Sequence, residues 1–195
     1  MRYFEHKLKT PLTRDARLIC YIPDNSEEIE PHRKRRAIII CPGGSYAKTS
    51  DREAEPIALE LLSMDCAVCI LRYSCAPRRF PKALCELAQS VLFLKENAER
   101  FNIDEGKILV MGFSAGGHLA ACLGIIPDEL EKLGYDEKLI RPAGMILCYP
   151  VITSGRYWHQ GSCDNLLGDE LIERSSAFSL EKRVNDKTPK AFIWQ

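Results

Sequence analysis

The chain has 195 residues, of which 46% are hydrophobic and 28% are charged, a length that predicts one domain with its own core. Its 27 basic residues balance its 27 acidic ones, so no overall charge would attract nucleic acid or a membrane surface. No apolar run approaches the roughly 20 residues of a membrane span, and the first residues lack the apolar segment of a signal peptide.

The chain carries nine cysteines, an odd number. Several lie within apolar runs, where a small thiol packs well: Cys20, Cys41, Cys69 and Cys148. Without a secretion signal, this usage predicts reduced thiols and a cytoplasmic location. Cys66 and Cys69 have the spacing of a redox or zinc pair, but residues three apart on a strand point to opposite faces. We therefore expect no metal site.

Short β-branched runs alternate with amphipathic helical patterns, which is typical of a parallel sheet covered by helices. Six strands are predicted, and four of them are near-continuous apolar runs, as expected for strands buried on both faces. They are Leu18–Ile22, Ala37–Cys41, Ala67–Arg72, Lys107–Met111, Gly144–Tyr149 and Ala191–Trp194. The basic run from His32 to Arg36 is interpreted as a solvated loop edge.

Three helices are predicted between these strands. The first covers Asp51–Met64 and has acidic residues in its first turn. The clearest covers Pro81–Phe101, where apolar residues recur at steps of three and four: Leu84, Leu87, Val91, Leu94 and Ala98. The third, Ala115–Leu123, is rich in alanine and glycine. Residues from Ile152 to Lys187 are expected to form an irregular insertion with short helices.

The segment after the fourth predicted strand has the pattern Gly-x-Ser-x-Gly, and an alanine-rich helix follows at once. A serine on such a sharp strand-to-helix turn, here Ser114, has a strained backbone that lifts its hydroxyl clear of the sheet. Glycine is needed at positions 112 and 116 because a Cβ there would collide with the neighbouring strand or with the turn. Ser114 is therefore predicted to be a catalytic nucleophile. The alternative is a serine that merely caps the helix, whereas a dinucleotide-binding turn would need glycine at position 114.

A second glycine-containing loop, Pro42 to Tyr46, follows the strand Ala37–Cys41. Acyl transfer needs hydrogen-bond donors aimed at the tetrahedral oxygen, and glycines let backbone N–H groups approach it. Gly43 and Gly44 are the predicted donors from this loop, and Ala115, directly after the nucleophile, supplies another. The alternative interpretation of the loop is an ordinary glycine turn.

These segments resemble the α/β-hydrolase esterases related to bacterial acetyl and feruloyl esterases and to hormone-sensitive-lipase-like carboxylesterases. The matching residues extend over nearly the whole chain: Pro42 to Tyr46, Leu71 to Tyr73, Gly112 to Ala120, Cys148 to Ile152, Asn165 to Gly168 and Thr188 to Trp194. The resemblance implies an α/β-hydrolase fold, with a mainly parallel sheet flanked by helices. It also maps the family's nucleophile to Ser114 and its oxyanion loop to Gly43 and Gly44.

The chain departs from the family pattern at two loop positions. Ser45 stands where a third glycine is usual, and Pro42 stands where many relatives have histidine. The second departure favours the esterases that act on side groups of polysaccharides.

In the family, the catalytic acid follows the strand that matches Ala191–Trp194, and the catalytic histidine comes later still. We therefore expect residues 1–195 to form a single incomplete domain that lacks the last strand or strands, a helix, and two members of the triad. Of the histidines, His118 is expected to support the elbow, and His159 to pack or to contact substrate. His6 lies in a terminal segment and His32 in the basic loop.

Three acids follow Ser114 in the chain: Asp164, Asp169 and Asp186. Each precedes the final strand and none is followed by a histidine, whereas this fold places acid and then histidine after the nucleophile. No triad is predicted among these residues.

The sequence thus predicts a serine-type carboxylic ester hydrolase of acylated carbohydrates that needs no cofactor and is inactive as this chain. A peptidase of the same fold is a related interpretation. A different class of function is a non-catalytic binding or assembly domain, or one completed by another chain. An open sheet edge at Ala191–Trp194 would then favour homo-oligomers.

Overall fold

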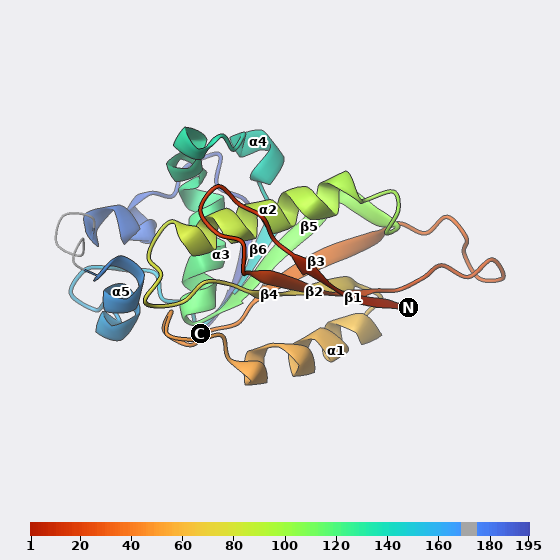
Figure 1. Cartoon of the computed structure of the whole chain (residues 1–195), viewed down its shortest axis with the longest axis horizontal. Coiled ribbons are helices and arrows are strands. Elements are labelled where there is room, and N and C mark those ends of the chain that lie inside the picture. Colours follow the sequence, from red (N-terminus) through yellow and green to blue (C-terminus); the bar gives the residue numbers. More distant parts are fainter. Residues whose placement is uncertain (169–174) are drawn as a thin grey trace.

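The computed structural model describes residues 1–168 and 175–195. Its sheet has seven strands in the order β1-β2-β4-β3-β5-β6-β7 (Figure 1). The strands are β1 (Arg2–Lys7), β2 (Arg17–Ile22), β3 (Arg35–Cys41), β4 (Ala67–Arg72), β5 (Ile103–Phe113), β6 (Gly144–Cys148) and β7 (Ala191–Trp194). Five strands, in the order β4-β3-β5-β6-β7, are mutually parallel. At one edge, β2 pairs antiparallel with β4 and β1 pairs antiparallel with β2. The α/β-hydrolase arrangement with a mainly parallel sheet is confirmed.

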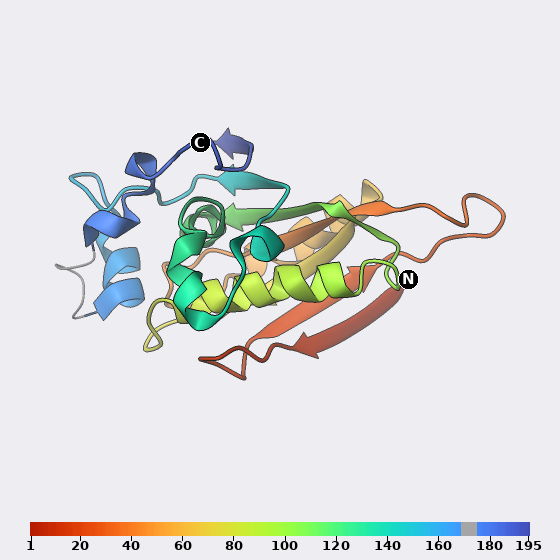
Figure 2. The same cartoon turned by 90° about the horizontal axis from the view of Figure 1, so that it is seen from above.

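Helices cover both faces of the sheet, as Figures 1 and 2 show. On one face lie α2 (Lys82–Glu96), α3 (Ala115–Ile125) and α4 (Glu137–Ile140), and on the other lies α1 (Glu55–Ser63). The insertion between β6 and β7 contains α5 (Gln160–Leu167) and the short 3₁₀ turns Ser175–Phe178 and Leu180–Lys182, as predicted. Two further 3₁₀ segments cover Asp51–Glu53 and Pro127–Leu133. Among the described residues, no helix combines the length and apolar character needed to cross a bilayer.

Several predicted boundaries differ from the structure for local reasons. The helix predicted at Asp51–Met64 is broken at Ala54, because Pro56 lacks an N–H and its ring disfavours a helical turn before it. The helix predicted at Pro81–Phe101 ends at Glu96, where the side chain of Asn97 donates to the Phe93 carbonyl.

Other elements were not predicted at all. Strand β1 is an edge strand whose residues are exposed or half-buried, so it lacks the apolar run that marks the central strands. The helix α4 and the 3₁₀ segment Pro127–Leu133 before it were also not predicted. The strand β5 was predicted, but it begins at Ile103 and not at Lys107.

The core is divided by the sheet into two clusters. The larger one packs beneath α2 and α3, and the smaller one packs against α1. Cys69 belongs to the first and Cys66 to the second, which confirms that this pair points to opposite faces. Cys69 instead lies directly opposite Cys20 on β2, with 3.4 Å between the two sulfurs.

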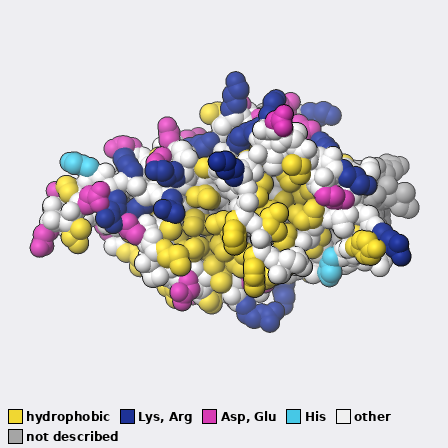
Figure 3. Space-filling view, turned by 180° about the vertical axis from the view of Figure 1, so that it is seen from behind, with side chains coloured by type: hydrophobic (Ala, Val, Ile, Leu, Met, Phe, Trp, Pro, Cys, Tyr) yellow, Lys and Arg dark blue, Asp and Glu magenta, His cyan; other side chains and the backbone are white. Residues whose placement is uncertain are grey.

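The face of the sheet that α1 covers is also apolar over β6 and β7, where its side chains are partly exposed to solvent. The strand register places Met111, Ile146 and Phe192 side by side on this face. Trp194 lies on the same face, two residues after Phe192 along β7. The side chains of Phe192 and Trp194 are 65% and 56% exposed. Figure 3, which views the molecule from the side of β6 and β7, shows hydrophobic side chains gathered over the middle of that view. We call Met111, Ile146, Phe192 and Trp194 the open apolar face.

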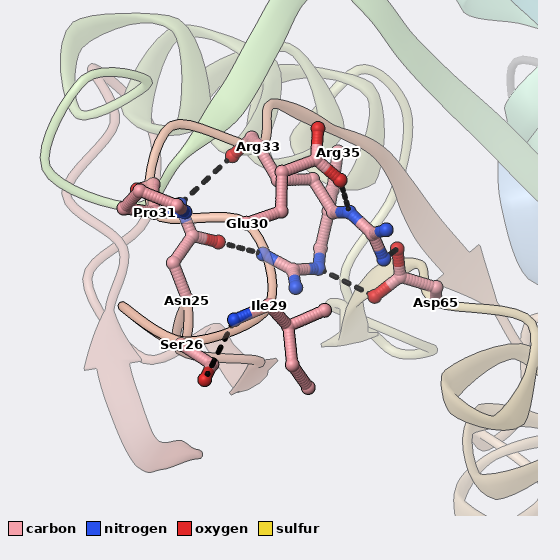
Figure 4. A network of polar contacts seen from close by, with 8 residues as sticks. All are labelled: Asn25, Ser26, Ile29, Glu30, Pro31, Arg33, Arg35 and Asp65. Carbon is pink, nitrogen blue, oxygen red and sulfur yellow. Dashed lines mark hydrogen bonds and ion pairs between the residues drawn. The ribbon is translucent and has the colours of Figure 1, made fainter.

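Two arginines of the basic run, Arg33 and Arg35, pair with carboxylates (Figure 4). Arg33 pairs with Glu30 at 2.6 Å and with Asp65 at 2.7 Å, and Arg35 pairs with Asp65 at 2.6 Å and also donates to Asn25. The solvated-edge interpretation therefore needs a correction at Arg35. This residue begins β3 and is buried, because its guanidinium is neutralised and hydrogen-bonded within the fold.

Candidate functional site

Ser114 lies between β5 and α3 in the conformation that the elbow requires. Its φ and ψ angles are 51° and −117°, a backbone conformation that residues other than glycine rarely adopt. Its N–H donates to the Cys148 carbonyl of β6 at 3.0 Å, and its carbonyl accepts from Val151 and His118, each at 3.1 Å. The residue is partly exposed although α3 behind it is buried. These backbone hydrogen bonds hold Ser114 in its strained conformation, while the residue remains partly accessible to solvent.

The two glycines of the motif are required by close backbone contacts. A methyl group on Gly112 would come within 2.1 Å of the Gly116 carbonyl oxygen, across the turn. A methyl group on Gly116 would come within 2.0 Å of the Cys41 carbonyl oxygen, on the neighbouring strand β3. Both predicted collisions are confirmed.

The loop after β3 passes directly beside Ser114. A methyl group on Gly43 would lie 3.1 Å from Ser114 Cβ, and one on Gly44, whose φ is +131°, would lie 2.3 Å from the Lys48 carbonyl oxygen. Ser45 and Tyr46 also have positive φ, at 55° and 56°. These three consecutive residues with positive φ turn the chain sharply after the end of β3.

The three predicted oxyanion donors differ in their availability. The Gly43 N–H already donates to Glu53 Oε2 at 2.6 Å, so it is not free to hold an oxyanion in this structure. The N–H groups of Gly44 and Ala115 have no hydrogen-bond acceptor within the part of the chain that is described. Ala115 is the first residue of α3, where the N–H lacks a partner within the helix. Gly44 and Ala115 remain the candidate donors.

His118 lies one turn into α3 and faces the interior. Its Nδ1 lies 3.0 Å from the Tyr46 hydroxyl, its ring is near Phe178, and the Cys122 thiol lies 3.6 Å from the same nitrogen. Burial lowers the pKa of His118 to about 4, so the imidazole is neutral at pH 7. The predicted supporting role fits this position, because His118 connects α3 to the oxyanion loop through Tyr46.

The other histidines lie in structural positions. The His6 ring stacks on Phe93 at 3.8 Å between centroids, at the edge of the sheet, and His32 is exposed in the basic loop. His159 caps α5, where its Nδ1 accepts from the Ser162 N–H. It also lines an open groove of 560 Å³ beside the ends of β6 and β7, together with Pro150, Val151, Thr153, Tyr157 and Ile193.

Within residues 1–168 and 175–195, the Ser114 hydroxyl makes no side-chain hydrogen bond. Asp164 and Asp186 are exposed, the first on α5 and the second before β7, while Asp169 lies outside the described residues.

A carboxylate near Ser114, that of Glu53, was not predicted from the sequence. Glu53 accepts hydrogen bonds from the Gly43 N–H and from the Tyr149 hydroxyl, which lies just after β6. Its sequence position suggested only an acidic residue near a helix start, and no local pattern marks a carboxylate that folds back onto a loop ten residues earlier.

The family model BD-FAE matches residues 20–141, which include the loop Pro42 to Tyr46, the turn at Ser114 and His118. Among curated proteins, the chain is 37% identical over 169 residues to endo-1,4-beta-xylanase B of Butyrivibrio fibrisolvens, covering 83% of this chain and 27% of that protein. It is 31% identical over 160 residues to acetylxylan esterase of Xylanibacter ruminicola, covering 80% of this chain and 29% of that protein. The chain thus spans less than a third of these relatives.

Solved structures resemble the chain over almost its whole length. The acetyl ester-xyloside bifunctional hydrolase of Caldicellulosiruptor lactoaceticus is 33% identical with a TM-score of 0.82, covering 96% of this chain and 68% of that one. A carboxylesterase of Lactobacillus plantarum is 25% identical with a TM-score of 0.85, covering 100% of this chain and 72% of that one.

Proposed function

Because the chain belongs to the BD-FAE family of α/β-hydrolase esterases, we propose that it carries the nucleophile and oxyanion hole of a serine carboxylic ester hydrolase. The observation that carries this proposal is the conformation of Ser114. A strained, accessible serine at the start of a buried helix is suited to acyl transfer when N–H groups nearby are free, and those of Gly44 and Ala115 have no acceptor among the described residues. A serine that only caps the helix is disfavoured, since its side chain makes no capping hydrogen bond.

In the proposed reaction, Ser114 Oγ attacks the ester carbonyl carbon and passes its proton to a base. The carbonyl oxygen becomes an oxyanion that accepts hydrogen bonds from the Gly44 and Ala115 N–H groups. Collapse of this intermediate expels the alcohol, which takes up a proton, and leaves an acyl group on Ser114. Water then attacks the acyl-enzyme, releasing the acid and restoring the hydroxyl.

The proposed substrates are short acyl esters of carbohydrates. The support is the kind of relative: an acetylxylan esterase and an acetyl ester-xyloside hydrolase are among the proteins that the chain resembles. Pro42, in place of a loop histidine, agrees with this branch. All nine cysteines are free thiols, which supports a reducing, cytoplasmic location.

We further propose that the 195-residue chain is a poor catalyst alone, because Ser114 lacks a base among the described residues. His118 is not available, since it is buried against Tyr46 and Phe178. Loss of the base in a serine hydrolase can lower kcat by about 10⁶-fold.

The test is covalent labelling of Ser114. The chain is incubated for hours with a fluorophosphonate, the adduct is located by peptide mass spectrometry, and hydrolysis of p-nitrophenyl acetate is followed in parallel. Slow labelling at Ser114, absent from Ser114→Ala and unchanged in the control Ser63→Ala on α1, is expected. Labelling elsewhere but not at Ser114 would contradict the nucleophile. Turnover as fast as that of an ordinary esterase would contradict the missing base.

The open apolar face favours a second candidate, a hydrolase-like domain that works through assembly. Phe192 and Trp194 are exposed on strand β7, and the outer edge of β7 has no neighbouring strand among the described residues. Unpaired edges and large apolar patches favour association. Under this proposal, copies of the chain associate through β7 whether or not Ser114 reacts.

A further inference from the structure

Glu53 joins the two strands that flank the nucleophile strand. It is the last residue of the 3₁₀ turn Asp51–Glu53, and its two carboxylate oxygens accept from different elements. Oε2 accepts from the N–H of Gly43, after β3, at 2.6 Å, and Oε1 accepts from the hydroxyl of Tyr149, after β6, at 3.0 Å. In the sheet, β3 and β6 are the neighbours of β5 on either side. The carboxylate therefore bridges the strand ends on both sides of Ser114.

This bridge lies close to the nucleophile. A methyl group on Gly43 would be 2.8 Å from Glu53 Oε2 and 3.1 Å from Ser114 Cβ. The same residue is tied on its other side, where the Gly43 carbonyl accepts from the Ser50 N–H at 2.8 Å. Gly43 is thus held through both its N–H and its C=O.

Holding Gly43 also sets the direction of the next N–H. In a trans peptide, the C=O of one residue and the N–H of the next point in opposite directions within one plane. The Gly43 carbonyl points to Ser50, so the Gly44 N–H must point the other way. Among the described residues, that N–H is the loop donor without an acceptor.

The loop needs such an anchor because its backbone is strained. Gly44, Ser45 and Tyr46 have consecutive positive φ angles. For residues with a Cβ, such conformations persist only where surrounding contacts over-determine them. A hydrogen bond from a backbone N–H to a carboxylate is stronger than one between neutral groups.

Tyr149 completes the bridge from the β6 side. Burial, and then the hydrogen bond and charge of Glu53, raise the pKa of Tyr149 to about 12, so the phenol remains a donor at neutral pH. Its ring packs against Phe113 and Trp194, with centroids 5.9 and 5.6 Å away, and its N–H donates to the Trp194 carbonyl at 2.6 Å. Both carboxylate oxygens of Glu53 are therefore engaged, which disfavours Glu53 as the base for Ser114.

We propose that Glu53 is a positioning residue of the oxyanion loop: it withdraws the Gly43 N–H from the hole and fixes the plane in which the Gly44 N–H faces the reacting carbonyl. This inference rests on the proposed esterase function for its consequence in catalysis. The bridge itself is a property of the folded chain and is testable without turnover.

The experiment compares Glu53→Ala, Glu53→Gln and Glu55→Ala. Glu55 is the matched control, because its carboxylate accepts from the Tyr21 hydroxyl at 2.7 Å, the same kind of bond two residues along and outside the site. The first readout is the amide spectrum of protein labelled with ¹⁵N-glycine. The second is the rate of fluorophosphonate adduct formation at Ser114, with thermal denaturation as a check on folding.

The Gly43 amide proton is expected to resonate downfield in the wild type. It should move strongly upfield in Glu53→Ala, less in Glu53→Gln, whose amide oxygen still accepts, and not at all in Glu55→Ala. Adduct formation should fall about 10²-fold in Glu53→Ala, the typical cost of a misplaced catalytic group, and less than about tenfold in Glu53→Gln.

The outcomes separate the two proposals. An unchanged Gly43 amide in Glu53→Ala overturns the inference whatever Ser114 does, and so does a wild-type labelling rate in that variant. If Ser114 is never labelled but the Gly43 amide responds as expected, the bridge is confirmed and the esterase proposal is contradicted. If Glu53→Ala does not fold, Glu53→Gln decides: an unmoved Gly43 amide there overturns the inference.

Discussion

Gly116 of α3 packs directly against Cys41 of β3, so closely that a methyl group on Gly116 would lie 2.0 Å from the Cys41 carbonyl oxygen. This contact brings the helix that follows Ser114 onto the strand that leads to the loop Pro42 to Tyr46, the proposed oxyanion loop. It is one of the backbone contacts that place the two halves of the candidate site side by side.

Gly116→Ala is expected to destabilise the chain by about 3 kcal/mol or more, because a backbone carbonyl must move to make room. Urea denaturation measures the change. Gly161→Ala is the control, since the nearest atom that a methyl group on Gly161 would meet beyond the adjoining backbone of α5 is His159 Cε1, at 3.7 Å. That variant should be neutral or up to about 1 kcal/mol more stable. Equal effects of the two substitutions would contradict the packing argument.

Replacing Ser114 by glycine should stabilise the fold relative to Ser114→Ala. Both variants lose the hydroxyl, but only glycine relieves the strain at a φ of 51°, which is worth about 1–3 kcal/mol. Glycine also lowers the free energy of unfolding by about 0.5–1 kcal/mol, because it loses more conformational entropy on folding than alanine does. We expect a net gain of about 1 kcal/mol over Ser114→Ala, measured by denaturation.

Ser63→Gly, at the end of α1, provides the comparison for Ser114→Gly, because Ser63 has no positive φ and glycine there should only destabilise. A Ser114→Gly variant less stable than Ser114→Ala would show that the elbow stores no strain.

His118 should make the stability of the chain depend on pH. Burial lowers its pKa from the ordinary 6.5 to about 4, so between these values the unfolded chain binds a proton that the native chain does not. The contribution is complete above about pH 6.5 and is lost as the pH falls toward 4. Between pH 7 and pH 5, the loss should be about 1–2 kcal/mol.

The measurement is the difference in urea denaturation between wild type and His118→Asn at both pH values. The asparagine amide can still meet the Tyr46 hydroxyl but does not titrate. The variant should therefore lose less stability on acidification, and parallel losses in the two proteins would rule out His118 as the titrating group.

Self-association through the open apolar face should depend on Phe192. Phe192→Glu places a charge at a residue that is 65% exposed beside Ile146, and it should shift the chain toward monomer in a concentration series followed by light scattering. Leu139→Glu, at a residue of α4 that is 54% exposed, should leave the association unchanged. A wild-type chain that stays monomeric at every concentration would contradict the proposal.

The sheet strands, the elbow and the glycine loop could be read from sequence because each has a local cause. Five consecutive positions from Ala37 to Cys41 are apolar and form the centre of the sheet, and Gly112 and Gly116 are required by backbone contacts close to the turn. Edge strand β1 was not predicted because an edge strand needs no apolar run. The break at Ala54 was not predicted because the acidic residues near Asp51 also suit the first turn of a continuous helix.

By itself, the sequence determined the fold class, Ser114 as the candidate nucleophile, and the loop that lies beside it. Local backbone requirements and apolar runs carry that information, since each acts over a few neighbouring residues. Only the tertiary structure decided which loop N–H groups are free, because Glu53 reaches Gly43 through folding and not through any motif. It likewise decided that His118 faces Tyr46 in the interior, since the direction of a side chain on a fully buried helix depends on what packs around it.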